Sequence, residues 1–282
     1  MVTSLRQQIQ AFYDASSGLW EDIWGEHMHH GYYGVDGKQP KDRYQAQVDL
    51  IEELLAWGRV TQAAQILDVG CGIGGSSLYL ASKFGAAVQG ITLSPVQARR
   101  ATERSHACQA DAQFQVVDAL AMPFADESFD LVWSLESGEH MPEKPRFLGE
   151  CYRVLKPGGM FLMATWCHRE TADPAGPLTP EETALLQRIY RVYCLPYIIS
   201  LGDYGAIAHQ LGFQQIRTTD WSDGVAPFWD EVIRSAFTPA AILGLVKAGP
   251  RIIQAAFAMQ LMRQGYQRGL IRFGVLAAQK AG

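Results

Sequence analysis

Residues 67–75, Leu-Asp-Val-Gly-Cys-Gly-Ile-Gly-Gly, decide the fold of this chain. They close a short apolar strand, Gln65–Val69, and lead into a helical pattern through Leu78 and Leu80. A glycine-rich turn at this point lets the backbone approach a ligand closely, and the start of the following helix offers free N–H groups. In open α/β sheets, ligands lie outside the carboxyl ends of the strands. The stretch therefore predicts an α/β sheet with a ligand site at this turn.

The rest of the chain repeats this alternation of strand and helix. Apolar segments are followed by helical patterns of about 10–15 residues, which indicates βαβ units and a mostly parallel sheet. The strands are apolar along their length, so we expect both faces of the sheet to be covered. The predicted strands are 65–69, 86–91, 114–118, 129–134, 160–166, 213–220 and 270–278, and the helices include 41–58, 144–155, 203–211 and 250–268.

We expect one doubly wound, Rossmann-like domain, because no linker separates two independent units. The predicted order is an N-terminal helical lid (1–58), a ligand-binding core (59–165), helical cap insertions around a returning strand (166–268) and a last strand (269–282). The lid begins with a helix that places Leu5, Ile9 and Phe12 on one face.

Composition excludes several classes of protein. The 282 residues are 48% hydrophobic and 19% charged, which is typical of a folded globular protein rather than a disordered one. A net charge of −5 argues against general nucleic-acid binding, which needs a basic face. The five cysteines form no CxxC pair, which predicts a reducing compartment without disulfides or structural zinc.

The charge is unevenly distributed along the chain. Residues 247–282 contain six Lys or Arg and no Asp or Glu, and the helix at 250–268 carries apolar residues on one face. This pattern predicts either peripheral docking on an anionic membrane surface or a buried lid helix with solvated arginines. The N-terminus has no secretory signal pattern and no apolar run is long enough to span a bilayer, so we expect a cytoplasmic protein.

The glycine turn alone fits two nucleotide classes. Gly70-x-Gly72-x-x-Gly75 matches a dinucleotide fingerprint, but Asp68 just before it would repel a pyrophosphate and attract a cation. The next strand runs into Thr92-Leu93-Ser94 without the ribose-binding acid of NAD sites. Asp118 and Ala119 after the third strand are placed to receive an adenine. A cationic adenosine, S-adenosylmethionine (SAM), fits this set best, with an NAD site or a purely structural turn as alternatives.

At this point the chain resembles class I SAM-dependent methyltransferases, and among them the gamma-tocopherol C-methyltransferases. Plant alkaloid N-methyltransferases share the pattern, so the resemblance indicates the scaffold better than the acceptor. The segments that carry it are 12–34, 67–81, 90–101, 128–142, 153–159, 164–169, 193–204, 221–233 and 268–274. It implies a seven-stranded sheet and transfer of a methyl group to a ring carbon of gamma- or delta-tocopherol, an apolar chromanol, in vitamin E biosynthesis. The second reaction that it allows is N-methylation of an apolar alkaloid amine.

The resemblance also implies three SAM motifs, at Ile66–Gly74, Phe129–Glu136 and Val154–Gly159. No metal is expected, because a sulfonium is already a good leaving group. The cofactor contacts implied are Gly70, Gly72 and Gly74 in the turn, Asp68 at the methionine end, Leu93 and Gln97 near the ribose, Asp118 and Ala119 near the adenine, and Ser134 in the second motif.

Methylation of a phenol's ring carbon needs a base, because the ring becomes nucleophilic when the phenol loses its proton. A free phenol has a pKa of about 10, so a histidine near 6.5 is better matched than a carboxylate near 4.3, unless burial raises the carboxylate. Glu136, Glu139 and His140 follow the fourth strand. We expect His140 to accept the proton and Glu136 to orient it or the substrate. The alternatives are that His140 only caps the next helix and that Glu136 contacts the cofactor.

The segment Gly25–Gly34 contains three histidines and two tyrosines. A metal site needs three or four ligands in a defined geometry, which neighbouring histidines on a glycine-rich loop rarely supply. We expect instead a lid in which Trp24, Tyr32 and Tyr33 close over the sulfonium, since aromatic faces attract a cation. Simple packing of these rings is the alternative. His168 is a second candidate base, or a buried structural histidine.

Overall fold

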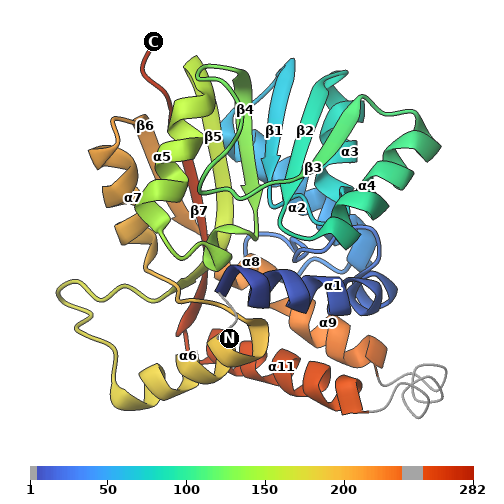
Figure 1. The fold of residues 1–282 in the computed structure, drawn as a ribbon. Coiled ribbons are helices and arrows are strands. Elements are labelled where there is room, and N and C mark those ends of the chain that lie inside the picture. Colours follow the sequence, from blue (N-terminus) through green and yellow to red (C-terminus); the bar gives the residue numbers. More distant parts are fainter. Residues whose placement is uncertain (1–4, 237–249) are drawn as a thin grey trace.

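The computed structural model describes residues 5–236 and 250–282; side chains are described except at 16, 18–24, 235–236 and 250–257. Seven strands form one sheet in the order β3-β2-β1-β4-β5-β7-β6 (Figure 1). β1 to β5 pair in parallel, and β7 lies antiparallel to both β5 and β6. The predicted doubly wound, mostly parallel sheet is thus confirmed. The strands are β1 Gln65–Val69, β2 Ala87–Thr92, β3 Ala112–Val116, β4 Phe129–Leu135, β5 Leu155–His168, β6 Gln214–Asp220 and β7 Ile271–Gln279.

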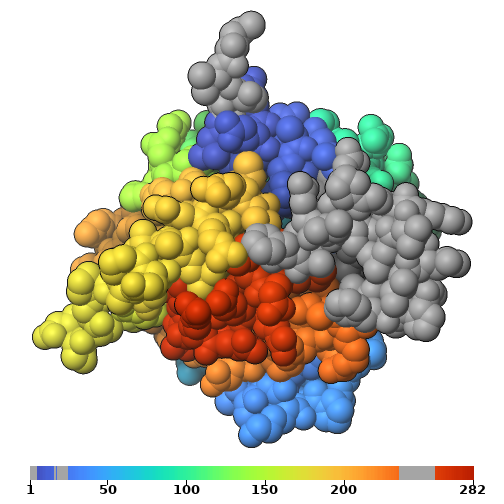
Figure 2. Space-filling view, turned by 90° about the horizontal axis from the view of Figure 1, so that it is seen from below, coloured from blue at the N-terminus to red at the C-terminus, as the bar shows by residue number. Residues whose placement is uncertain are grey.

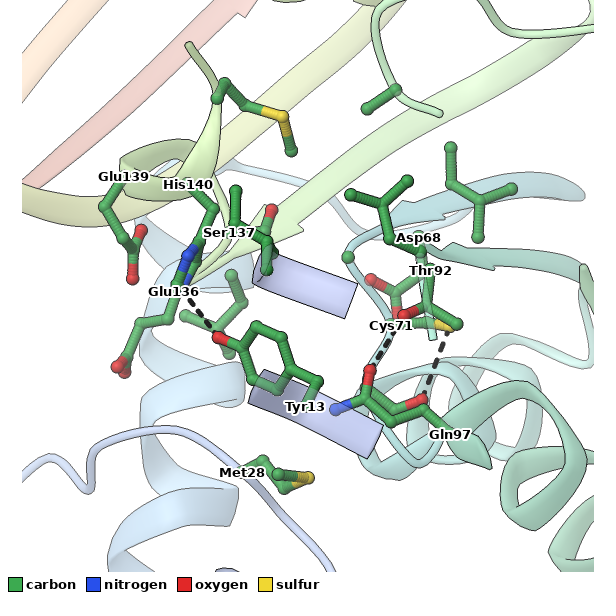
Figure 3. A pocket seen from close by; sticks show the side chains of 18 of the residues that line it. Tyr13, Met28, Asp68, Cys71, Thr92, Gln97, Glu136, Ser137, Glu139 and His140 are labelled. Atoms are coloured by element: carbon green, nitrogen blue, oxygen red, sulfur yellow. Dashed lines mark hydrogen bonds between the residues drawn. The ribbon is translucent and has the colours of Figure 1, made fainter. Parts of the chain in front are cut away.

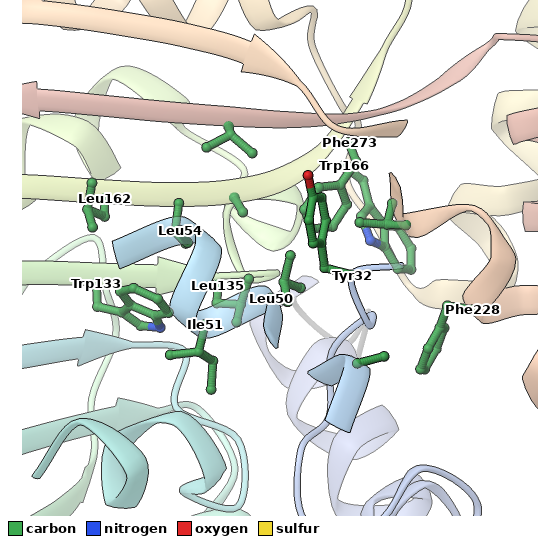
Figure 4. Packing of buried hydrophobic residues seen from close by; sticks show 14 of the residues in the cluster. Tyr32, Leu50, Ile51, Leu54, Trp133, Leu135, Leu162, Trp166, Phe228 and Phe273 are labelled. Atoms are coloured by element: carbon green, nitrogen blue, oxygen red, sulfur yellow. The ribbon is translucent and has the colours of Figure 1, made fainter. Parts of the chain in front are cut away.

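Helices cover both faces of the sheet. On one face, α2 and α3 contribute to a core with Trp133 and Leu162, and Figure 4 shows Leu50, Ile51 and Leu54 of α2 packed there. On the other face, α5 and α7 bury Phe147 and Tyr204 against the strands. α4 contacts β2 and β3 near the edge of the sheet, on the face that α3 covers. These helices are α2 Arg43–Gly58, α3 Gly75–Phe84, α4 Pro95–Cys108, α5 Lys144–Val154 and α7 Leu201–Gln210.

A second group of helices lies beyond the carboxyl ends of the parallel strands (Figure 1). α1 runs across these ends and contacts α4 and α9, whereas α11 packs against α6 and α9. Seen from that side in Figure 2, α6 and α11 lie next to each other. The cap elements are α1 Leu5–Trp24, α6 Pro180–Tyr193, α8 Ser222–Val225, α9 Pro227–Ala236 and α11 Pro250–Gln267. They place a roof over the edge of the sheet at which a ligand is expected.

Several predicted boundaries were wrong by a few residues. α2 begins at Arg43 rather than Lys41, because the Asp42 side chain accepts a hydrogen bond from the backbone N–H of Gln45 and caps the helix. β5 begins at Leu155 rather than at Met160, so it is longer than predicted at its start. α7 begins at Leu201, where Ser200 and Asp203 form a capping box. Local capping chemistry decides these ends, and the order of the elements is as predicted.

Candidate active site

One cavity lies at the carboxyl ends of β1, β2 and β4, under α1. Figure 3 shows Asp68, Thr92 and Gln97 on one side of it and Glu136, Glu139 and His140 on the other. We call these sides the cofactor end and the acceptor end. Further lining residues include Leu5, Arg6, Ile9, Phe12, Tyr13, Met28, His29, Gly70, Gly72, Leu93, Asp118, Ala119, Ser137, Met141, Trp166 and Tyr193.

The glycine turn is shaped by close packing. Gly70 has a φ of 84°, its N–H bonds the Ile91 carbonyl, and a Cβ at this position would overlap the side chain of Ser137. Ser137 is held in place because its hydroxyl donates to the Val69 carbonyl at 2.6 Å. Gly72 has a φ of 53° and lines the cavity. Only glycine fits both the left-handed backbone and the space at residue 70.

Asp68 is a buried carboxylate at the cofactor end. It is 2% exposed, and the Ser77 hydroxyl donates to Asp68 Oδ2 at 2.6 Å. Burial raises the pKa of Asp68 to about 7, since the carboxylate is desolvated. Among the residues that the structure describes, no basic side chain pairs with it. A buried acid that lines a cavity without a cationic partner fits a ligand that brings its own positive charge, as the SAM methionine end does.

The residues predicted for the nucleoside are grouped beside this acid. Leu93, Gln97, Asp118 and Ala119 all line the cavity. The Thr92 hydroxyl donates to Gln97 Oε1 at 2.7 Å, so the Gln97 amide group is fixed with its nitrogen end left for a ligand. The chain has placed these residues where a ribose and an adenine could follow the methionine end.

Three residues predicted to bind cofactor have other positions in the described structure. Gly74 is the N-cap of α3 and packs close to Phe114, so its role is to let helix and sheet approach. The Ser134 hydroxyl shares a hydrogen bond with Ser137 Oγ at 2.8 Å and thereby supports the turn from behind. Tyr33 is 3% exposed in the core of the cap. None of the three lines the cavity as described, and their direct contact with the cofactor stays a prediction.

Glu136 at the acceptor end is held by three N–H groups. The His30 backbone N–H donates to Oε1 at 2.6 Å, and His30 Nδ1 lies 2.8 Å from Oε2. The Trp166 indole N–H also donates to Oε2 at 3.0 Å. Glu136 has a φ of 53°, a backbone region that non-glycine residues rarely adopt and that often marks functional sites. The described hydrogen bonds of Glu136 are to His30 and Trp166 and none is to His140, so Glu136 does not orient His140 directly; its contact with the substrate stays a prediction.

His140 lies on the short 3₁₀ helix η1 Gly138–His140 and contacts the lid. Its Nε2 is 2.6 Å from the hydroxyl of Tyr13 on α1 (Figure 3). Burial lowers the pKa of His140 to about 3, with a further contribution from Lys144. The gap to a phenol of pKa about 10 is then roughly 7, or about 10 kcal/mol. This environment argues against our expectation that His140 is the base.

Glu139 on the same turn has the opposite electrostatics. It is 1% exposed, and the Thr165 hydroxyl donates to its Oε2 at 2.7 Å. Burial and the neighbouring Glu136 raise the pKa of Glu139 to about 7. The gap to a phenol is then roughly 3, or about 4 kcal/mol. Burial has thus raised the pKa of this carboxylate enough to make Glu139 better matched to a phenol than His140.

Two residues of this end were missed by sequence reasoning. Tyr13 lines the cavity and is the residue after Phe12, the last member of the predicted apolar face of the first helix. This position was the sequence signal that could have indicated it. Lys144 Nζ donates to the carbonyls of Gly138 and Glu139 at 2.8 and 3.0 Å, and burial lowers its pKa to about 7. No spacing rule predicts a buried lysine that holds the turn from the next helix.

The remaining candidate histidines help to hold the fold, and of these His29 also lines the cavity. His27 and His29 are buried, and the Gln47 amide donates to their carbonyls at 2.7 and 3.0 Å, which holds the loop on α2. Within residues 5–236 and 250–282, no group of three His, Cys, Asp or Glu is arranged to hold a metal. His168 Nδ1 pairs with the Arg169 carbonyl at 2.7 Å and is not among the cavity-lining residues described, so it is not a base there.

The described rings of the predicted lid favour the alternative of simple packing. Tyr32 is buried and packs against Trp221, so it belongs to the core rather than to the cavity (Figure 4 shows its surroundings). The side chain of Trp24 lies outside the described residues. The roof of the cavity is α1, through Leu5, Ile9 and Tyr13.

The basic C-terminal tract pairs with acids from elsewhere in the chain. Arg263 forms an ion pair with Asp230 at 2.7 Å, Arg272 with Asp220 at 3.5 Å and Lys280 with Glu127 at 3.5 Å. Met259 and Met262 of α11 are buried, while Lys247 and the side chains of Arg251, Ile252 and Ala256 lie outside the described residues. The described part of this tract fits a packed cap better than a free cationic surface.

Comparisons with known proteins agree with this geometry. Residues 67–163 match the family described as "Methyltransferase domain". The chain is 46% identical to the chloroplastic tocopherol O-methyltransferase of Arabidopsis thaliana, over 98% of this chain and 83% of the relative. The chain belongs to the tocopherol methyltransferase family. It is therefore a SAM-dependent methyltransferase, and the alternative of an NAD site is wrong.

Two further likenesses define the range of this methyltransferase scaffold. Norajmaline N-methyltransferase of Rauvolfia serpentina is 30% identical, over 98% of both chains. A crystal structure of a putative sarcosine dimethylglycine methyltransferase from Galdieria sulphuraria superposes with a TM-score of 0.80 and 26% identity, covering 95% of this chain and 99% of the other. The scaffold thus occurs among proteins named for different acceptors, and the acceptor end must distinguish them.

Proposed function

We propose that this methyltransferase transfers the methyl group of SAM to the aromatic ring carbon of gamma-tocopherol, giving alpha-tocopherol, and of delta-tocopherol, giving beta-tocopherol. The observation that carries the proposal is one cavity with a buried acid at one end and two carboxylates with buried side chains at the other, under the apolar face of α1. The name of the Arabidopsis relative, a tocopherol methyltransferase, supports the choice of acceptor.

The cofactor end is proposed to bind SAM without a metal. Asp68 would attract the methionine ammonium, Gly70 and Gly72 would pack against the cofactor, Leu93 and Gln97 would contact the ribose, and Asp118 with Ala119 would contact the adenine. When bound, SAM supplies an electrophilic methyl group on a sulfonium with a neutral leaving group. The protein must then hold the two reactants in line, which can contribute roughly 7–11 kcal/mol.

The acceptor end is proposed to hold a phenol whose tail is apolar. Ile9 and Phe12 from α1, with Met141 and Trp166 opposite, give this part of the cavity apolar walls. Glu136, fixed by its three N–H donors, would accept a hydrogen bond from the acceptor hydroxyl and set the orientation of the ring. Such a site favours a chromanol over a charged small molecule.

The location of the protein in the cell is a separate prediction from its activity. No helix of the described residues is long and apolar enough to cross a membrane. Cytoplasmic location and peripheral membrane contact remain predictions, which cell fractionation and co-sedimentation with anionic liposomes would test. A requirement for anionic lipid is not expected, because three of the four described basic residues of the C-terminal tract are paired with acids.

The decisive experiment incubates the protein with methyl-labelled SAM and a panel of tocopherols, tocotrienols, benzoquinols and amines. We expect a labelled product from gamma- and delta-tocopherol that keeps a free phenol, because the methyl group is on carbon. A product methylated on oxygen has lost that phenol and does not ionise at high pH. Binding of S-adenosylhomocysteine without turnover of any acceptor would instead indicate a protein that only binds the nucleoside.

A second candidate function is N-methylation of an apolar amine. It is favoured by the likeness to norajmaline N-methyltransferase and by the rings of Tyr13, Trp166 and Tyr193 beside the acidic residues Glu136 and Glu139. Aromatic faces and carboxylates together attract an ammonium group. The amine members of the panel test this function, and a labelled amine formed faster than any labelled phenol would favour it.

A further inference from the structure

Three side chains at the acceptor end could take a proton from a phenol: Glu136, Glu139 and His140. All three line the cavity and follow β4 within five residues of chain. Their hydrogen-bond partners differ, and these partners decide which of the three is available. The argument rests on the proposed function, because it requires a phenolic acceptor in this cavity.

His140 is already engaged as an acceptor. The Tyr13 hydroxyl is buried, burial keeps its pKa well above the usual value, and its partner is His140 Nε2 at 2.6 Å. A hydroxyl that faces an imidazole lone pair donates to it, so the ring proton of neutral His140 then lies on Nδ1. A neutral imidazole has one lone pair, and Tyr13 occupies it here, so His140 positions the lid helix.

Glu136 is engaged on both oxygens. Three N–H groups point at it, two from His30 and one from Trp166, and the side chain of His30 is fully buried. Three of its four lone pairs thus accept N–H groups, which favour the charged carboxylate, and one lone pair is left to accept from a hydroxyl. Glu136 is suited to orient a hydroxyl and unsuited to hold its proton.

Glu139 has the partners that proton uptake requires. Its hydrogen bonds come from the Thr165 hydroxyl and its own backbone N–H. A hydroxyl can rotate to accept as well as donate, so this contact survives protonation of the carboxylate. Lys144 fixes the turn by donating to two of its carbonyls, without bonding the carboxylate itself.

From this geometry we propose that Glu139 is the general base that takes the phenolic proton, and that Thr165 and Lys144 are its positioning residues. The acceptor O–H bond breaks and its proton passes to a Glu139 oxygen. The ring carbon then forms a bond to the methyl group, and the electron pair of the S–CH₃ bond stays on sulfur. Loss of the hydrogen on that carbon to water, with return of the proton from Glu139 to the oxygen, restores the phenol and releases one proton overall.

The charged surroundings of Glu139 make the base responsive to pH. Burial and Glu136 raise its pKa to about 7, and Lys144 opposes this rise. The groups that face it from packed elements are Glu136 beyond β4, Lys144 on α5, Tyr13 on α1, Cys167 on β5, Tyr204 on α7 and Tyr266 on α11. Tyr13, Cys167, Tyr204 and Tyr266 are held neutral by raised pKa values, so Glu136 and Lys144 are the neighbours that act on the carboxylate.

The test compares Glu139→Gln with Glu143→Gln, which makes the same change on an exposed residue of the same loop. With gamma-tocopherol at pH 7.5, Glu139→Gln should lower kcat by roughly 100-fold or more, while Glu143→Gln leaves it unchanged. Both variants should keep the thermal shift given by S-adenosylhomocysteine. Between pH 7.5 and 9.5 the Glu139→Gln rate should rise about tenfold per pH unit as the phenol ionises unaided, whereas the wild-type rate is flat.

Two results would overturn the inference while leaving the proposed function intact. One is a Glu139→Gln kcat within threefold of the wild type, and the other is a deficit that stays constant across pH, as expected of a structural role. A wild-type protein that methylates no phenol would overturn the proposed function and this inference with it. These outcomes are separable because the wild type is assayed first on the same acceptors.

Thr165→Val provides a second test that keeps the carboxylate, should Glu139→Gln fail to bind S-adenosylhomocysteine. The Thr165 hydrogen bond lowers the pKa of Glu139, so its removal should raise that pKa. The acidic limb of the kcat profile should then move to higher pH by roughly one unit. An acidic limb that does not move would contradict the role of Glu139 as the base.

Discussion

The two ends of the cavity are built in different ways. The cofactor end comes from short segments that directly follow β1, β2 and β3, so each contact is close in sequence to a strand that the sheet positions. The acceptor end joins distant segments: Tyr13 meets His140 across 127 residues, and His30 meets Glu136 across 106. The first end depends on backbone shape, and the second depends on docking the N-terminal segment onto the sheet.

The largest expected effect is at the cofactor end, from Gly70→Ala. A Cβ there would overlap Ser137, and the left-handed φ of 84° disfavours any side chain by about 1–3 kcal/mol. We expect binding of S-adenosylhomocysteine to weaken by about 100-fold or more, and the melting temperature to fall by roughly 5–10 °C. Calorimetry and thermal unfolding measure the two effects.

Gly85→Ala is the matched control for this substitution. Gly85 also has a left-handed φ, 60°, but no atom lies within 4 Å of an added Cβ. The Gly85→Ala variant should lose stability through backbone strain alone and keep its affinity for S-adenosylhomocysteine. Equal loss of affinity in the two variants would show that close packing of the turn does not build the cofactor end.

This difference explains why the fold and the cofactor end were predictable. β1 was predicted at its observed bounds because an apolar strand followed by glycines is a local pattern. Leu93, Gln97, Asp118 and Ala119 were assigned through their places after successive strands, and they line the cavity. Gly74 and Ser134 belong to the same motifs but face the packing behind the turn, which a linear pattern cannot distinguish.

The acceptor end could be predicted only as a set of neighbouring residues. Glu136, Glu139 and His140 were placed together correctly, but their roles depend on groups from α1, β5 and α5. Burial reverses the order of base strength that free side chains have, because it disfavours the charged form of an acid and of an imidazole alike. The pKa of Glu139 rises to about 7 while that of His140 falls to about 3, which no spacing indicates.

The next largest effect should come from Tyr13→Phe, which separates the lid from the acceptor end. The change leaves His140 Nε2 buried without its partner, at a cost of about 1–3 kcal/mol when α1 is docked. We therefore expect kcat/KM for the acceptor to fall by roughly 5–150-fold, with a smaller change in affinity for S-adenosylhomocysteine. Steady-state kinetics with gamma-tocopherol measure it.

Tyr44→Phe, at a side chain that is 53% exposed, is the control and should be silent. His140→Ala should abolish most of the additional effect of Tyr13→Phe, since residues in direct contact are not additive. Fully additive losses in the double variant would mean that the two side chains act separately, and the lid would then dock by its apolar face alone.

A smaller effect, about tenfold, should appear when cofactor affinity is measured against pH. Asp68 has a pKa raised to about 7 in the unliganded protein, so it is protonated and neutral at pH 6 and charged at pH 8. Because only the carboxylate attracts an ammonium group, the affinity for S-adenosylhomocysteine should rise about tenfold from pH 6 to pH 8. Calorimetry at three pH values measures this rise.

The same proton links Asp68 to stability. Between roughly pH 4 and 7 the folded protein holds a proton on Asp68 that the unfolded chain releases, so this stabilising contribution is lost as pH rises through 7. Bound ligand compensates for that loss, and its thermal shift should grow over the same range. Asp68→Asn should bind weakly with no dependence on pH. A wild-type affinity that does not change between pH 6 and 8 would contradict the role of Asp68.

The smallest effect should come from the contact that joins the lid to the cofactor end. Arg6 of α1 lies 3.5 Å from Asp118 and its side chain is 59% exposed, so the ion pair contributes about 0–1 kcal/mol. Because an adenine would use the same carboxylate, Arg6→Gln should leave the affinity for S-adenosylhomocysteine unchanged or tighten it by up to about fivefold. Lys38→Gln, which breaks an exposed pair with Asp36 away from the cavity, is the matched control. A clear loss of affinity in Arg6→Gln alone would mean that the lid helix holds the cofactor directly, and the two ends would then form a single closing unit.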